Sequence, residues 1–158
     1  DFSYLQDAED PRRGFVLLAG EAKAMGSPEH KRGGKRYPER TLTIDIDKRI
    51  KEVKYTSIDL KRRSDPQVTK EWAEFIMETP PAFFAGWLMR LATRNRLEHI
   101  FEKLMGVAEY TNGVGVALYR ERADGHYEWI EKVPKPLLTI EELVEEICRH
   151  LRDLRANI

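Results

Sequence analysis

Arg40–Arg63, RTLTIDIDKRIKEVKYTSIDLKRR, is the stretch from which the fold is most directly predicted. Its first part, Leu42–Asp47, alternates apolar and polar side chains, which is the period of a β-strand with one buried face. Ile50–Tyr55 is expected to form a second strand after a turn at Lys48 and Arg49. This pair lacks the preference for positive φ of the favoured hairpin turns, but the alternation on both sides of it predicts a β-hairpin.

The hairpin would gather three chemically distinctive side chains on its polar face. Asp45 would face Glu52 on the neighbouring strand, and Lys54 would lie two residues beyond Glu52. Two facing carboxylates suit Mg²⁺ or Mn²⁺, because these cations prefer oxygen ligands. The lysine would then orient a water or stabilise charge on a phosphate.

This set of residues resembles the active-site hairpin of PD-(D/E)xK nucleases. The resemblance implies a metal-dependent phosphodiesterase in which Asp45, Glu52 and Lys54 are catalytic and Asp45 and Glu52 hold the metal. Because 34% of the residues are charged, the alternative is a solvated sheet face with cross-strand ion pairs.

A second E-x-K pattern competes with the first. It spans Glu21–Lys23, follows the apolar run Phe15–Ala19 and has Asp10 upstream. Both patterns remain candidates from the sequence.

Length and composition indicate one globular domain over residues 1–158. Hydrophobic residues make up 41% of the chain, which is enough for a substantial core. The single cysteine, Cys148, excludes an internal disulfide and fits the cytoplasm or another reducing compartment. No apolar run has the length of a membrane span. The chain begins at Asp1 rather than Met, so we interpret it as a trimmed or processed product or as part of a longer protein.

Charge is unevenly distributed along a chain with 27 lysines and arginines and 27 aspartates and glutamates. Residues 29–63 carry twelve basic residues against six acidic ones, and the remainder is acidic. A local basic patch binds anions even when the whole protein is neutral. The pI near 7.1 nevertheless argues against a dedicated nucleic-acid-binding protein.

Residues 24–40, AMGSPEHKRGGKRYPER, are expected to form a mobile basic loop because glycines and prolines interrupt any regular pattern. Such a loop would wrap a phosphate backbone, with Tyr37 stacking on a base. The alternative is a hairpin tip that its charge keeps soluble. The expected anion-binding residues of this loop and of the segment after it are Lys31, Arg32, Lys35, Arg36, Tyr37, Arg40, Lys61, Arg62 and Arg63.

Periodicity and end signals predict the remaining elements. Residues 1–13 are expected to be an irregular lead-in, and Gly14–Lys23 a central strand because its apolar run is continuous. Three helices are expected between residues 64 and 106, of which the second begins near Ala82 and the third ends at Gly106.

A β-meander and a last helix are expected to follow. Asn112–Gly113 would join the strands Val107–Thr111 and Val114–Arg120, and a further turn would lead into His126–Lys132. Thr139 has the spacing from Glu142 of a helix capping box.

These elements predict an α+β domain with a mixed or mainly antiparallel sheet of about five to six strands and three to four helices packed on one side. The leading functional prediction is a non-catalytic binding module that contacts nucleic acid or an acidic protein surface through a basic hairpin and loop at about residues 30–63. The alternatives are the Mg²⁺- or Mn²⁺-dependent nuclease and a structural or assembly subunit. Outside the nuclease alternative no cofactor is expected, and the histidines lack zinc-ligand spacing.

Overall fold

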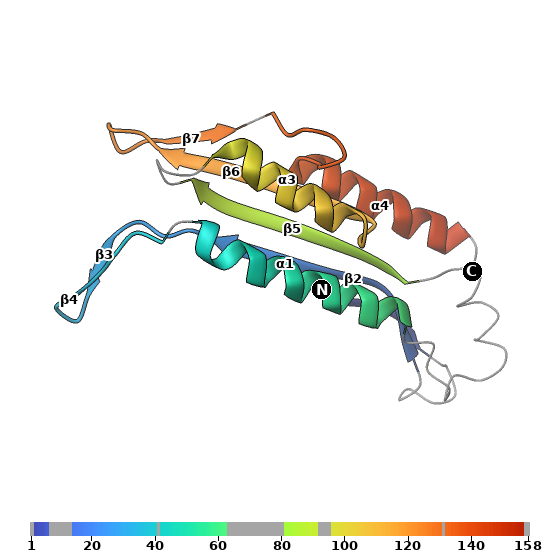
Figure 1. Ribbon diagram of the computed structural model, residues 1–158. Helices are drawn as coiled ribbons and strands as arrows, with labels where there is room; N and C mark the ends of the chain where they lie inside the picture. Colours follow the sequence, from blue (N-terminus) through green and yellow to red (C-terminus); the bar gives the residue numbers. More distant parts are fainter. Residues whose placement is uncertain are drawn as a thin grey trace.

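The computed structural model describes residues 2–6, 14–40, 42–62, 81–91, 96–130 and 132–156 (Figure 1). In these residues it contains a five-stranded sheet, a separate two-stranded hairpin and three helices. None of these helices is both long enough and apolar enough to cross a membrane. In chain order the elements are β1 (Phe2–Gln6), β2 (Gly14–Met25), β3 (His30–Arg32), β4 (Lys35–Tyr37), α1 (Leu42–Arg62), β5 (Ala82–Leu91), α3 (Leu97–Ala108), β6 (Gly113–Glu121), β7 (Tyr127–Ile130) and α4 (Ile140–Ala156).

Three parallel strands form the centre of the sheet, whose strand order is β1-β2-β5-β6-β7. β5 runs parallel to both β2 and β6, while β1 and β7 pair antiparallel at the two edges. Parallel neighbours need a crossover connection, and α1 and α3 lie in the two connections that the chain makes here. The α+β class with a mixed sheet is therefore confirmed, as is the inner position of β2.

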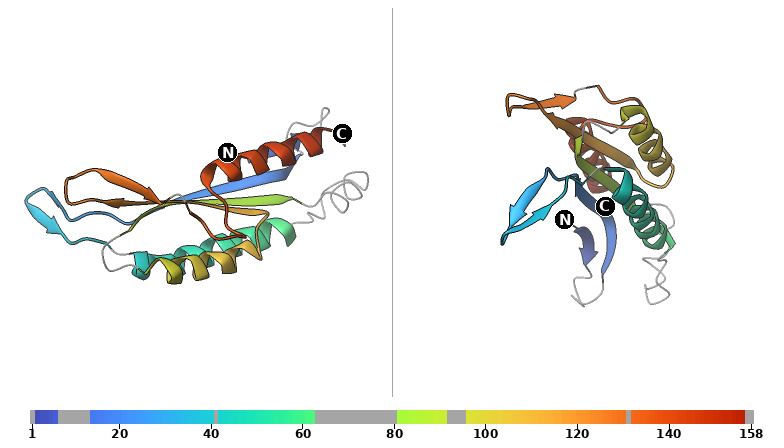
Figure 2. Two further views of the ribbon diagram at one scale, coloured as in Figure 1. Left: turned by 90° about the horizontal axis from the view of Figure 1, so that it is seen from above. Right: turned by 60° about the vertical axis from the view of Figure 1, so that its left-hand side comes forward.

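Helices cover both faces of the sheet, as the view from above in Figure 2 shows. α1 and α3 pack on one face through the larger core, to which Val53 and Trp87 belong. α4 packs on the opposite face through a smaller cluster that includes Phe84 and Leu143. The prediction that the helices pack on one side is wrong, because β5 carries apolar side chains on both of its faces.

Residues 42–62 form helix α1, and the predicted hairpin is wrong. The side chains that α1 buries follow the three- or four-residue spacing of a helix face: Leu42, Ile46, Ile50, Val53 and Ser57. This spacing continues across the residues that the prediction assigned to a turn. Asp45, Glu52 and Lys54 therefore lie on one helix rather than on two facing strands.

The helix predicted from Ala82 is instead strand β5. Almost every residue of β5 is buried, because the strand lies between two parallel neighbours and is covered on both faces. A continuous apolar run has the same appearance in a buried strand and in a buried helix. The first of the three predicted helices, over residues 64–79, lies outside the described residues.

The predicted meander is only partly correct. β6 and β7 form the expected antiparallel hairpin, but Val107 belongs to α3, which continues past Gly106. Asn112 does not start a hairpin turn. Its side-chain Oδ1 accepts a hydrogen bond from Phe83 N–H at 2.9 Å, and its own N–H donates to Phe83 O at 2.7 Å. Asn112 thus leads the chain into β6 alongside β5.

Two segments that were predicted to be irregular contain strands. β1 lies within the predicted lead-in and pairs with β2. The predicted loop over residues 24–40 holds the end of β2 and the hairpin formed by β3 and β4.

The last helix is confirmed together with its capping box. Thr139 Oγ1 accepts a hydrogen bond from Glu142 N–H at 3.2 Å, and the Glu142 carboxylate accepts one from Thr139 N–H at 2.9 Å. These bonds satisfy two of the donors that a helix leaves unpaired at its start.

Candidate active site

Glu21 and Lys23 lie on the face of β2 that α1 covers. They are two residues apart on a strand and therefore point to the same side. In the parallel register they pair with Ala85 and Trp87 of β5, which belong to the core under α1. Charged side chains here occupy positions where the neighbouring strand has core residues. Because partial burial of charged groups costs free energy, this pair is a candidate for a functional role.

Lys23 is held between two carboxylates that come from different elements. Its Nζ forms an ion pair with Oε1 of Glu21 and lies 3.4 Å from Oε2 of Glu52 on α1. The Lys23 side chain is only 16% exposed, so the two carboxylates fix the direction of its ammonium group. Arg49 donates a hydrogen bond of 2.7 Å to the same oxygen of Glu52.

The second carboxylate oxygen of Glu21, Oε2, is buried and accepts no hydrogen bond within the part of the chain that the structure describes. Buried polar atoms are rarely left unpaired, and a free carboxylate oxygen is a suitable ligand for a hard cation. No group of three potential metal ligands occurs in those same residues, so a cation at Glu21 would take further ligands from water or substrate.

Arg49 and Lys23 hold the pKa of Glu52 below its ordinary value. The hydrogen bond from Arg49 is the largest cause; burial opposes it, and the hydrogen bond from Lys23 adds a smaller lowering effect. Glu52 is therefore ionised at neutral pH, and it keeps its attraction for the Lys23 ammonium group.

Asp45 and Glu52, two of the predicted catalytic residues, share one face of α1. They are seven residues apart, which is close to two helical turns. Arg49 lies between them and is attracted electrostatically to both, and also to Glu21. Both carboxylates thus lie on the side of α1 that carries Arg49, and only that of Glu52 has a contact with β2, through Lys23, among the described residues.

Lys54, the third predicted catalytic residue, does not join this group. Its Nζ lies 4.4 Å from the centre of the Tyr110 ring, over which it forms a cation–π contact. The amine beside Glu52 belongs instead to Lys23, from the second E-x-K pattern.

Only part of this site could be found from the sequence. The Glu21–Lys23 pattern is visible because it follows an apolar run that predicts a strand. Its contact with Glu52 spans 29 residues and joins a strand to a helix, so no local periodicity predicts it.

Most of the predicted anion-binding residues lie on the β3–β4 hairpin, residues 30–37, which we call the arm. It projects from the end of the sheet (Figure 1), and every residue of its two strands is exposed. Gly33 and Gly34 form the turn with φ of 57° and 75°, as a tight two-residue hairpin turn requires. Four of the predicted residues supply the basic charge of the arm: Lys31, Arg32, Lys35 and Arg36.

The other predicted anion-binding residues are placed differently. Tyr37 stacks on His30 with ring centres 5.1 Å apart, so one face of the ring is already covered. Arg40 N–H donates to Ser27 O at 3.0 Å at the base of the arm. Lys61 and Arg62 lie in the last turn of α1, at the end away from the arm (Figure 1), and Arg63 lies outside the described residues.

The base of the arm is fixed to the end of the sheet. Gly26 has φ of 82°, and a Cβ at this position would lie 2.6 Å from the backbone oxygen of Arg90. The Arg90 side chain, which is 10% exposed, forms ion pairs of 2.7 Å with Glu39 and 3.2 Å with Glu121. Residues before and after the arm are therefore both joined to β5.

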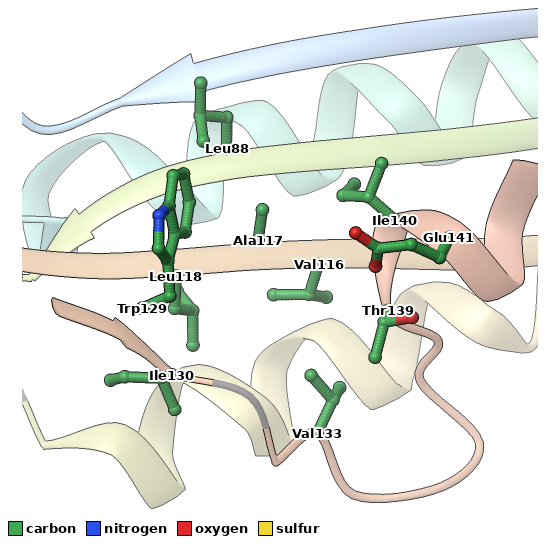
Figure 3. Close-up of a pocket in the computed structure, with 10 residues that line it drawn as sticks. All are labelled: Leu88, Val116, Ala117, Leu118, Trp129, Ile130, Val133, Thr139, Ile140 and Glu141. Carbon is green, nitrogen blue, oxygen red and sulfur yellow. The ribbon is translucent and has the colours of Figure 1, made fainter.

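A separate apolar cavity of about 660 Å³ lies beside β6, between β7 and the start of α4 (Figure 3). Leu88 and Trp129 are 42% and 58% exposed at its upper side. Thr139, its hydroxyl-bearing residue, already caps α4. The cavity is lined by Leu88, Val116, Ala117, Leu118, Trp129, Ile130, Val133, Thr139, Ile140 and Glu141, a set without convergent catalytic groups.

No protein-family model matches this chain, and neither the curated proteins nor the solved structures contain a match to it. A function is therefore inferred from the side chains of the site and the arm.

Proposed function

We propose that this chain is a divalent-metal-dependent phosphodiester hydrolase that acts on nucleic acid through Glu21, Lys23 and Glu52. The observation that carries the proposal is the amine of Lys23, held between two carboxylates beside the unpaired, buried Oε2 of Glu21. A protein that only binds anions at its surface has no need for such a group opposite core residues. The lowered pKa of Glu52 agrees with this proposal, because perturbed pKa values cluster at functional sites.

The residues of the site fit Mg²⁺ or Mn²⁺. Glu21 offers a free carboxylate oxygen, and Glu52 offers a second carboxylate close by. Mg²⁺ in phosphate chemistry commonly takes only one or two protein carboxylates and completes its shell with water and substrate oxygens. Bound there, the cation would polarise the phosphate and lower the pKa of a coordinated water.

Lys23 would stabilise the negative charge that develops on the phosphate, or orient the attacking water. A lysine ammonium group has three donors, and the two glutamates take two of them. No other described residue takes the third, which would bind a substrate oxygen or a water. Arg49 supports this role because its hydrogen bond holds the Glu52 carboxylate in position and lowers its pKa.

The position of the E-x-K pattern supports the resemblance to PD-(D/E)xK nucleases. Glu21 and Lys23 lie on β2, which also pairs antiparallel with β1 up to Ala19, whereas Asp45, Glu52 and Lys54 lie on a helix. Asp10, upstream of this pattern, lies outside the described residues.

Cleavage assays with isosteric variants test the proposal. Plasmid DNA, single-stranded DNA and RNA are incubated with Mg²⁺ or Mn²⁺, and EDTA should abolish cleavage. Glu21→Gln and Lys23→Met should each lower the rate by about 100-fold or more, the usual cost of removing one catalytic group.

Lys54→Met is the matched control, because it removes the lysine of the competing E-x-K pattern. Its rate should stay within a few-fold of wild type. Absence of metal-dependent cleavage on all three substrates would rule the hydrolase out, and full activity in Glu21→Gln would rule out this site for it.

The second candidate function is the non-catalytic binding module, and the exposed basic arm favours it. If this candidate is correct, the protein should bind nucleic acid or an acidic protein surface through the arm. It should cleave no nucleic acid in Mg²⁺ or Mn²⁺. The same assays therefore separate the two candidates.

A further inference from the structure

We infer that the arm is a docking ribbon for double-stranded DNA and that it enters the major groove. The inference rests on the proposed nucleic-acid partner, which the hydrolase and the binding module share. It goes beyond both, because it names the form of the nucleic acid and the element that holds it.

The shape of the arm fits the major groove of B-form DNA. The arm is a two-stranded antiparallel ribbon with three paired residues in each strand, and neighbouring strands are about 4.8 Å apart. The major groove is about 12 Å wide and admits such a ribbon. Figure 1 and the right-hand view of Figure 2 show the arm extending away from the sheet and helices, so a duplex could approach it.

Like charges face each other across the two strands of the arm, and this arrangement destabilises the arm. Lys31 lies directly opposite Arg36, and Arg32 lies directly opposite Lys35. Like charges at directly opposed positions destabilise a strand pair. Arg36 has an ion pair with Glu29, but the other three have no acidic partner among the described residues. A ribbon with positive charge on both faces is suited to lie between two phosphate backbones, which would relieve this repulsion.

The anchored base makes the arm a positioned element rather than a free tail. Gly26 lies three residues after Lys23 on the same chain segment, and its close approach to Arg90 fixes where the arm begins. Glu39, which follows the arm in the chain, forms an ion pair with Arg90 as well. DNA that the arm holds is thereby placed at the end of β2, the strand that carries the candidate active site.

Two observations favour duplex DNA over other nucleic acids. Stacking on single strands uses free aromatic faces, and Tyr37 already has one of its two faces stacked on His30. The major groove of A-form RNA is too narrow for protein elements to read. Contacts from lysine and arginine to phosphates predict binding with little dependence on base sequence.

Fluorescence anisotropy with a labelled DNA duplex of about 20 base pairs tests the inference, in EDTA so that no cleavage occurs. The triple variant Lys31→Gln, Arg32→Gln and Lys35→Gln should bind at least about tenfold more weakly at 0.1 M salt. The slope of log K against log salt should fall by about 2 to 3, because each phosphate contact contributes about 0.9. The variant should melt no lower than wild type, since the substitutions remove repulsion.

The matched control removes three basic residues from α4 instead: Arg149→Gln, Arg152→Gln and Arg155→Gln. It should bind the duplex with the wild-type affinity and slope. Equal affinity of wild type and arm variant for duplex DNA would overturn the inference, as would equal arm-dependent binding of a single strand or of duplex RNA.

The binding and cleavage assays together show whether the docking ribbon or the hydrolase has failed. Arm-dependent binding of duplex DNA without cleavage in Mg²⁺ or Mn²⁺ would remove the hydrolase and leave the docking ribbon. Metal-dependent cleavage together with binding that does not depend on the arm would remove the docking ribbon and leave the hydrolase.

Discussion

Gly115 lies where α4 packs directly against β6. A Cβ at this position would lie 2.5 Å from Cδ2 and 2.8 Å from Cβ of Leu143, so Gly115→Ala would push α4 away from the sheet. We expect this substitution to lower the free energy of unfolding by about 1–3 kcal/mol, the usual cost of overpacking a core. Urea denaturation of both proteins measures the difference.

Gly20→Ala is the control for this prediction. A Cβ at Gly20 would meet only the backbone oxygen of Phe84, at an ordinary 3.7 Å. The control should therefore be close to neutral or slightly stabilising, because alanine loses less backbone entropy on folding than glycine. Equal stability of Gly115→Ala and wild type would show that α4 does not pack as closely as described.

At the residue scale the sequence shows which residues could be catalytic more readily than it shows which residues they contact. Glu21 and Lys23 are adjacent in a short pattern and could be read from it, whereas the contact between Lys23 and Glu52 joins residues that are 29 positions apart. Lys54 fits the same pattern equally well but contacts Tyr110. Only the tertiary packing of α1 on β2 distinguishes the two lysines.

At the scale of elements, the cap of α4 gives a direct test. Thr139→Ala removes the hydroxyl that accepts the Glu142 N–H at 3.2 Å. It should destabilise the protein by about 1 kcal/mol, the typical cost of losing a helix N-cap. Thermal or urea denaturation measures the loss.

Thr56→Ala is a matched control within a helix. Thr56 Oγ1 bonds back to Glu52 O at 3.0 Å inside α1, a contact that adds little to helix stability. Its removal should change stability by much less than Thr139→Ala. A larger effect at Thr56 than at Thr139 would contradict the capping assignment.

The elements that the sequence predicted correctly have strong local signals. α4 has a capping box, and β2 has a continuous apolar run that the structure places inside the sheet. The two elements that were predicted wrongly, α1 and β5, lack such signals. The alternation over Leu42–Asp47 is too short to separate a strand from the helical spacing that continues to Ser57, and the apolar run of β5 suits a buried strand and a buried helix alike.

At the scale of the whole molecule, the order of strands could not be derived from local patterns. β5 lies between β2 and β6 because α1 and α3 carry the chain back across the same face. Which strands become neighbours depends on these crossovers, and they in turn depend on recognising α1 as a helix. The error over residues 42–62 therefore also explains why the parallel pairing of β2, β5 and β6 was not predicted.

This architecture predicts a gradient of local stability across the sheet. β5 is hydrogen-bonded on both sides and is buried on both faces. α4 contacts the sheet through the smaller cluster around Leu143, and its outer face exposes Val144 and Leu151. Regions with fewer buried contacts open at lower free energy, so α4 should open before the sheet does.

Native-state hydrogen exchange measures this difference. Protection of α4 amides should be at least about tenfold lower than that of β5 amides, which corresponds to about 1.4 kcal/mol or more. Leu143→Ala should accelerate exchange mainly in α4, whereas Leu104→Ala, in the larger core under α3, should lower protection throughout the sheet. Equal protection of α4 and β5 would mean that both faces unfold as one unit, because the smaller cluster would then hold α4 as firmly as the larger core holds α1 and α3.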